Sequence, residues 1–140
     1  MNVWVVYAFV SMFFAGFTSV IAKKGLTDIS GDLGLVIRTI FVFLFTIVFA
    51  SLVVPQKDWG TLKPHNWIWL GASAVTTMLS WIFYYRAIKA GEVSTVALID
   101  KGSVLVSVIL SLWLLHESLT LPKLIGAALI VGGLVVIARG

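Results

Sequence analysis

Five long apolar runs, separated by short polar segments, decide what this chain can fold into. A helix needs about 20 apolar residues to cross the hydrocarbon core of a bilayer, and each run has roughly that length. Only 11% of the residues are charged, against about a quarter in soluble domains, and 60% are hydrophobic. A soluble fold of 140 residues could not bury that much apolar surface. The pattern therefore predicts an all-α integral membrane protein, a bundle of five transmembrane helices.

The five runs occupy nearly the whole chain, so we expect a single membrane domain over residues 1–140. The expected spans are residues 3–22, 33–54, 67–88, 93–115 and 121–138. The apolar runs are continuous rather than alternating, and each is about twice the length of a barrel strand, which argues against a β-barrel. The segments between the last three spans are very short, so these spans are expected to form consecutive antiparallel hairpins.

Basic residues gather at the ends of the runs, and their distribution predicts how the chain is oriented. We attribute the net charge of +4 to these flanking residues and expect no nucleic-acid partner. One expected side carries Lys23, Lys24, Arg38, Arg86, Lys89 and Arg139, and the other carries Lys57, Lys63 and Lys123. The larger set is expected in the cytoplasm, which places the N-terminus outside the plasma or inner membrane. The bias is small enough to be compatible with both orientations of the same chain.

Polar side chains inside the expected spans follow single helix faces. Apolar side chains do not drive helices together in a bilayer, so small and polar residues mark the faces that matter. The third span carries Ser73, Thr77, Ser80 and Tyr84 at helical spacing, and the fourth carries Asp100, Ser103, Ser107 and Ser111. Interhelical packing is the alternative explanation. Because the fourth stripe contains an acid, we favour a hydrated path, with Thr77, Ser80, Tyr84, Ser103 and Ser107 as hydrogen-bonding residues for a substrate.

Three charged residues lie inside the spans rather than at their ends. Asp100 and Lys101 are adjacent and point about 100° apart, so they do not pair on one face. Arg38 lies about a turn into the second span and is a candidate counter-ion for Asp100. A charge near a span centre costs roughly 2.5–3.5 kcal/mol on the insertion scale and marks a substrate or ion pathway by default. We predict that these three residues bind substrate or cycle a proton; the alternative is that Arg38 and Lys101 snorkel while Asp100 forms a structural pair.

Two spans carry small residues on one face, which allows close approach of helix backbones. The predicted packing residues are Ala8, Ser11 and Ala15 in the first span and Gly126, Ala128, Gly132 and Gly133 in the fifth. Their partners are expected either within the chain or in a second chain. Trp81 and Trp113 lie further inside the spans than the other tryptophans, and lipid-facing bulk is the simplest interpretation of them.

The residues that soluble active sites use are scarce. The chain has no cysteine, which excludes disulfides, thiolate metal sites and a cysteine nucleophile. It has no phosphate-binding glycine loop, and its two histidines, His65 and His116, are far apart near span ends. We therefore expect no metal, no cofactor and no enzymatic activity.

Six stretches carry a resemblance to a known family: Ser11–Gly25, Arg38–Thr39, Ser80–Lys89, Ala97–Lys101, His116–Glu117 and Leu124–Gly133. In their order and spacing, they resemble one repeat of the EamA-type transporters of the drug/metabolite transporter superfamily, in its half-size five-span form. The resemblance implies two five-helix repeats of opposite orientation around a central cavity, and movement of metabolites by alternating access. The chain departs from the family in having one repeat, and in having His116 where glycine is common.

The resemblance and the charged spans together predict a transporter for a small polar metabolite. Because the chain holds one repeat, a second copy is expected to supply the other half, as an antiparallel homodimer in the lipid bilayer. The alternative is a structural or regulatory membrane subunit of a larger complex that transports nothing. That alternative predicts a fixed orientation and a strong hetero-partner.

Overall fold

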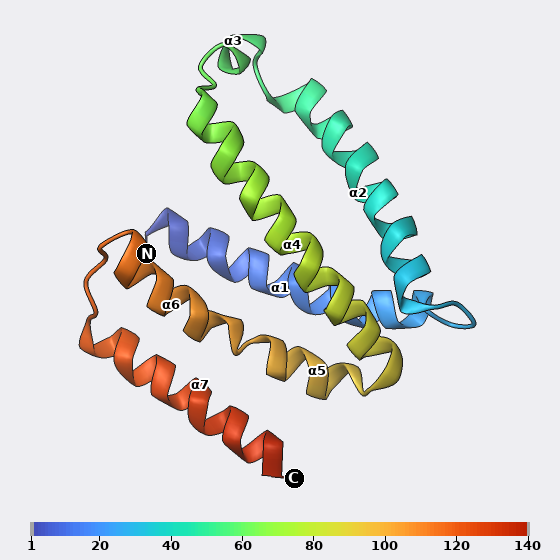
Figure 1. Cartoon of the computed structure of the whole chain (residues 1–140), viewed down its shortest axis with the longest axis vertical. Helices are drawn as coiled ribbons and strands as arrows, with labels where there is room; N and C mark the ends of the chain where they lie inside the picture. Colours follow the sequence, from blue (N-terminus) through green and yellow to red (C-terminus); the bar gives the residue numbers. More distant parts are fainter. Residues whose placement is uncertain (1, 140) are drawn as a thin grey trace. The chain divides into compact units, whose positions relative to one another are not determined.

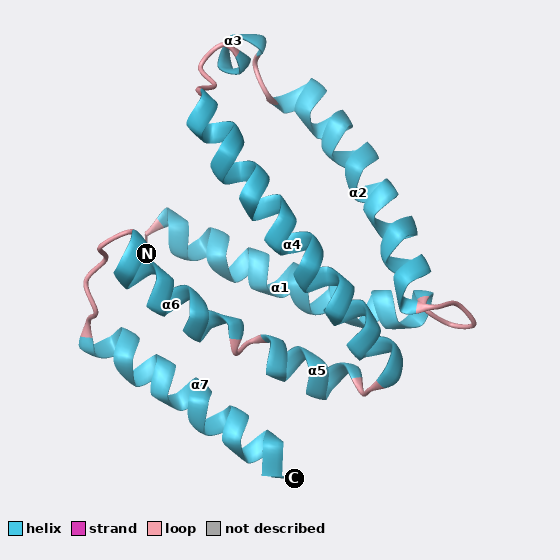
Figure 2. Cartoon of the chain, viewed as in Figure 1, coloured by secondary structure: helices cyan, strands magenta, loops and turns pink. Residues whose placement is uncertain are grey.

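The structure is a computed structural model that describes residues 2–139, and these residues form helices joined by short connections, without a strand (Figures 1 and 2). The helices are α1 (Val3–Gly25), α2 (Gly31–Val53), α3 (Gln56–Trp59), α4 (Pro64–Ala90), α5 (Val93–Asp100), α6 (Ser103–Leu114) and α7 (Leu121–Arg139). Five segments are long and apolar enough to cross a membrane, namely α1, α2, α4, α5 with α6, and α7. The predicted all-α fold with five spans is confirmed.

The chain forms two compact units. One unit comprises Val20–Ala90 and contains the end of α1 together with α2, α3 and α4. The other comprises the residues up to Ser19 and those from Gly91 onward, and contains the rest of α1 together with α5, α6 and α7.

The helix ends differ from the expected ends because a helix continues after its side chains become polar. The helix α1 runs to Gly25, past the expected end at residue 22. The helix α2 begins at Gly31 because the Ser30 hydroxyl accepts a hydrogen bond from the Leu33 N–H at 3.1 Å, which caps the first turn. The helix α4 begins at Pro64, whose missing N–H costs nothing at the first helical position, and it ends at Ala90.

The fourth span, expected over residues 93–115, is confirmed over Val93–Leu114, but it is not one continuous helix, because α5 ends at Asp100 and α6 begins at Ser103. Between them the backbone tightens into a turn: the Gly102 N–H donates to the Ile99 carbonyl at 2.9 Å and the Lys101 N–H donates to the Leu98 carbonyl at 3.2 Å. These bonds reach back three residues rather than four. Glycine is a poor helix former, and its presence at this point favours the interruption. The stripe from Asp100 to Ser111 is therefore not one uninterrupted helix face.

The core of the Val20–Ala90 unit lies where α1 ends, α2 begins and α4 ends. Its buried side chains are Leu26, Leu35, Tyr85 and Ile88. Gly31 is also buried, and a Cβ atom there would lie 2.8 Å from the Tyr85 carbonyl oxygen. The backbones of α2 and α4 therefore touch at this point, and only glycine allows that approach.

In the other unit, α7 returns beside α5 and α6 as an antiparallel hairpin (Figure 1). A Cβ atom on Gly102 would lie 3.0 Å from Leu134 Cδ1, so α7 packs on the interruption between α5 and α6. The tight turn after α6 is present although His116 replaces the glycine common in the family. His116 adopts a left-handed backbone with φ 53°, and the next N–H, that of Glu117, donates to the Ser111 carbonyl at 3.2 Å.

Most large apolar side chains outside this core are exposed, among them Phe43 at 63% and Leu129 at 72%. Apolar surface of this extent is typical of helices that face lipid or another chain rather than water.

Candidate functional site

Arg38 lies on α2, half-buried, against two aromatic rings of α4. Its Cζ atom is 4.2 Å from the centroid of the Trp81 ring and 5.9 Å from that of Tyr85. Both distances are within the range of a cation–π interaction, with Trp81 the closer ring. The expectation that Trp81 is lipid-facing bulk is wrong, because its half-buried ring covers the Arg38 guanidinium.

The rim of the same guanidinium is not satisfied. The Arg38 Nη1 atom is buried and has no hydrogen-bond partner among the described residues. A guanidinium presents five N–H donors around its edge and none on its faces. The aromatic rings use none of these donors, so the Nη1 atom keeps donor capacity for an acceptor.

Sequence reasoning missed both aromatic partners. The polar stripe of the third span predicted Tyr84 as a site residue. In the structure Tyr84 is half-buried, and the tyrosine ring near Arg38 is that of the next residue, Tyr85. The signal that could have found the site is the spacing of Trp81 and Tyr85, four residues apart on one face of α4.

Asp100 and Lys101 lie at the interruption of the fourth span. Asp100 is the last residue of α5 and is half-buried, and Lys101 is exposed in the turn that follows. Asp100 belongs to a different unit from Arg38. Pairing of these two residues stays a prediction.

The serines of the fourth span are largely satisfied by their own helix. The Ser107 hydroxyl donates to the Ser103 carbonyl at 3.2 Å, and the Ser111 hydroxyl donates to the Val108 carbonyl at 3.0 Å. In the third span, the Thr77 hydroxyl donates to the Ser73 carbonyl at 2.8 Å. Each of these hydroxyl oxygens keeps lone pairs that could still accept a bond from a substrate. Ser80 and Ser103 are exposed on α4 and α6.

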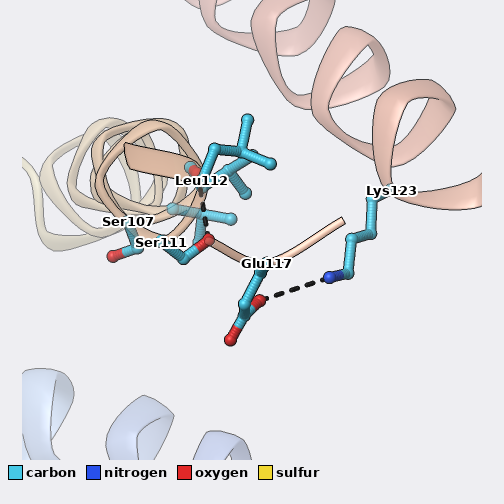
Figure 3. A pocket seen from close by; sticks show the side chains of 7 residues that line it. Ser107, Ser111, Leu112, Glu117 and Lys123 are labelled. Atoms are coloured by element: carbon cyan, nitrogen blue, oxygen red, sulfur yellow. Dashed lines mark hydrogen bonds and ion pairs between the residues drawn. The ribbon is translucent and has the colours of Figure 1, made fainter. Parts of the chain in front are cut away.

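Two of these serines line an open pocket of about 280 Å³ at the end of α6 (Figure 3). The lining residues are Val104, Ser107, Val108, Ser111, Leu112, Glu117 and Lys123. The Lys123 ammonium lies 3.3 Å from a Glu117 carboxylate oxygen across the loop between α6 and α7. The structure thus joins Ser107 and Ser111 to a charged pair, of which the sequence had indicated only Lys123, as a flanking residue.

A cluster of reciprocal polar contacts joins the ends of α1 and α4. The Lys23 ammonium donates to the Ile88 carbonyl at 2.5 Å and the Lys89 ammonium donates to the Leu26 carbonyl at 2.9 Å. Lysines at helix C-termini satisfy the last carbonyls and complement the helix dipole. These contacts bring Lys23 and Lys89 to one end of the unit, as their assignment to one membrane side requires.

The predicted small packing faces are open in this structure. Ala8, Ser11 and Ala15 are exposed on α1. No atom of the described residues, apart from the helix's own backbone, would lie within 4 Å of a Cβ atom built on Gly126, Gly132 or Gly133, and Ala128 is exposed. The glycine that does make a close helix contact in this unit is Gly102, which the sequence pattern did not single out.

Residues 2–139 contain no cluster of three or more metal-ligating side chains. The Val20–Ala90 unit offers a cation with an unpaired donor on α2 and hydroxyl groups along α4, and the other unit offers an acid beside a helix interruption and hydroxyl groups along α6. Such groups inside apolar spans can bind a polar molecule and change its protonation or pairing, but they form no nucleophile–base set.

Comparison with known proteins agrees with this architecture. The EamA-like transporter family matches residues 2–139. A Sinorhizobium protein named "Uncharacterized transporter in cobO 3'region" is 33% identical over 138 residues, which cover 96% of each chain. No solved structure gives a significant match. With its five apolar helices, the chain therefore belongs to the EamA-like transporter family and is a multi-pass membrane transporter of the drug/metabolite transporter type.

Proposed function

We propose that this protein moves a small polar metabolite across the plasma or inner membrane by alternating access. The observation that carries the proposal is the half-buried Asp100 at the interruption of a membrane span, with Lys101 beside it. Interrupted helices near the middle of a membrane are a recurrent way to present backbone and side-chain groups to a substrate or a coupling ion. In this proposal Asp100 takes up and releases the coupling proton, and the hydroxyl groups of α4 and α6 contact the substrate.

The working form is a homodimer of two five-helix halves in opposite orientation. The similar length of the Sinorhizobium relative supports a five-helix chain as a recurring unit, since the match covers 96% of both proteins. The open small faces of α1 and α7 support a second chain as their partner, because such faces permit close helix contact. The N-terminus lies outside in the favoured orientation, and the small charge bias is compatible with both orientations.

Transport is tested with the purified chain in liposomes that contain a pH-sensitive dye, challenged with a panel of amino acids, amines and carboxylates. We expect at least one compound to move protons through the native protein, and Asp100→Asn to abolish that signal. Lys57→Gln, which removes a charge in α3, is the matched control and should leave transport intact. If transport were unchanged in Asp100→Asn across the pH range, Asp100 would not be the coupling site.

The antiparallel homodimer is tested by fusing a cytoplasmic or an external reporter after residue 140. Activity of both reporters in separate cultures is expected if the chain inserts in both orientations. A single orientation would contradict the antiparallel homodimer while leaving transport itself open to the liposome experiment.

A further inference from the structure

We infer that Arg38, which lies beside Trp81 and Tyr85, binds the carboxylate of a small organic anion, and that this anion is the substrate class of the transporter. The inference rests on the proposed transport function and adds what that proposal leaves open, the sign and shape of the substrate. It starts from Arg38, a cation in an apolar span, which has aromatic rings beside it and an N–H donor without an acceptor.

Two aromatic rings of α4 lie beside the guanidinium. Trp81 lies at 4.2 Å and Tyr85 at 5.9 Å from the Arg38 Cζ atom, and the Tyr85 side chain is only 4% exposed. The buried tyrosine is fixed in the core of the unit, so this aromatic wall is part of the fold rather than a chance contact. Aromatic faces stabilise a cation without using any of its N–H donors.

The edge of the guanidinium lacks an acceptor. The Nη1 atom is buried and unpaired among the described residues, and such an atom is costly unless something accepts from it. A planar carboxylate accepts two parallel N–H bonds from an arginine fork, which is the strongest common pairing for this group.

No acid of the same unit fills this role. The Asp32 carboxylate is engaged by Arg86 through both oxygens, at 2.8 and 3.0 Å. Asp28 lies in the loop before α2, and Asp58 lies in α3, beyond the other end of α2. The salt bridges formed among residues 2–139 do not include Arg38.

The charge count favours a carboxylate over a phosphate. Arg38 supplies one positive charge, and a monocarboxylate cancels it, so the bound pair is neutral in the apolar span. A phosphate monoester carries up to two negative charges near neutral pH and would leave a net charge in the membrane, which is costly.

The test uses the purified full-length chain in detergent and measures the thermal unfolding midpoint against benzoate at matched ionic strength. Benzamide, benzylamine and phenyl phosphate serve as neutral, cationic and dianionic counterparts that carry the same phenyl ring. We expect benzoate alone to raise the midpoint saturably, because a ligand that binds only the native state stabilises it. Equal stabilisation by benzamide or benzylamine, or stronger stabilisation by phenyl phosphate, would overturn the inference.

Variants assign the effect to the site. Arg38→Gln should weaken benzoate binding by about tenfold or more, and Arg38→Lys should weaken it less, because lysine keeps the charge but loses the fork. Trp81→Phe should retain benzoate binding and Trp81→Leu should weaken it. This comparison tests the site even if Arg38→Gln does not fold. Lys63→Gln, at the start of α4, is the matched charge control and should bind as the native chain does.

The two proposals can fail separately. Benzoate binding that depends on Arg38, in a chain that moves no carboxylate into liposomes, would contradict transport and leave the anion site standing. Proton-coupled movement of amines or neutral compounds that is insensitive to Arg38→Gln would contradict the anion site and leave transport standing.

Discussion

Arg86 and Asp32 lie 54 positions apart in the sequence, and they form a two-bond ion pair across α4 and α2, with Arg86 Nε 2.8 Å from Asp32 Oδ1 and Arg86 Nη2 3.0 Å from Oδ2. Both side chains are more than half exposed, so solvent and salt weaken the pair. It nevertheless lies beside the contact between Gly31 and the Tyr85 backbone. The pair therefore joins α2 to α4 near this contact and contributes little to stability by itself.

Removing this pair should have a small effect on stability. Asp32→Asn and Arg86→Gln are each expected to lower the thermal unfolding midpoint slightly, and the double variant should lose less than the sum of the two. The exchanged pair, Asp32→Arg with Arg86→Asp, should recover only part of the loss, because an acid is favoured in the first turn of α2. Strict additivity of the single variants in low salt would contradict the pairing.

The contact of Gly31 with α4 should be far more sensitive. Gly31→Ala places a methyl group 2.8 Å from the Tyr85 carbonyl oxygen, which is backbone and cannot rotate away. We expect a loss of about 1–3 kcal/mol in the free energy of unfolding. The matched control is Gly16→Ala in α1, where nothing beyond the helix's own backbone lies within 4 Å, and it should gain about 0.5–1 kcal/mol. Denaturation in a mild detergent measures both, and a Gly31→Ala chain as stable as the Gly16→Ala chain would show that the helices are not in contact.

The turn after α6 carries strain that a glycine would remove. His116 has φ 53°, a conformation that costs a residue with a Cβ atom roughly 1–2 kcal/mol. His116→Gly removes this cost but makes the unfolded chain more flexible, so we expect a net gain of about 0.5–1 kcal/mol. Ser118→Gly in the same loop adds the same flexibility without relieving strain and should destabilise. A fall in the unfolding midpoint with His116→Gly would mean that the turn is not left-handed.

The packing of α7 on the helix interruption should appear as coupling between two positions. Gly102→Ala places a methyl group 3.0 Å from Leu134 Cδ1 and 3.0 Å from the Ile99 carbonyl oxygen, and Leu134→Ala relieves the first of these two contacts. Each single change should destabilise the chain, and the double variant should be more stable than their sum by about 0.5 kcal/mol or more. A double-mutant cycle of unfolding free energies in detergent measures the coupling. If the two changes were additive, α7 would not pack on the interruption.

Most of the fold follows from local sequence. Runs of about 20 apolar residues form helices in a bilayer because only a helix satisfies every backbone group internally, so the number of spans was predictable. The interruption at Lys101 and Gly102 was not, because hydropathy stays high through α5 and α6 and does not report a change from four-residue to three-residue hydrogen bonds. The helix ends were missed by a few residues because a helix continues after its side chains become polar.

The candidate site was predictable only as a list of residue types. Arg38, Asp100 and Lys101 stand out because charges inside apolar spans are costly. Their surroundings depend on which residue of α4 faces α2. The sequence pattern predicted Tyr84 as a site residue, while the aromatic rings that contact Arg38 in the structure are those of Trp81 and Tyr85.

By itself, the sequence determined the membrane class, the five spans and the charges that cannot be ordinary flanks, because those depend on composition and on spacing along one helix. The tertiary structure decided which side chains meet: Trp81 and Tyr85 around Arg38, Asp32 with Arg86, and Leu134 against Gly102. These contacts join positions far apart in the chain and require close approach at glycines. Hydropathy does not record such an approach, because it counts how apolar a residue is and not what lies beside it.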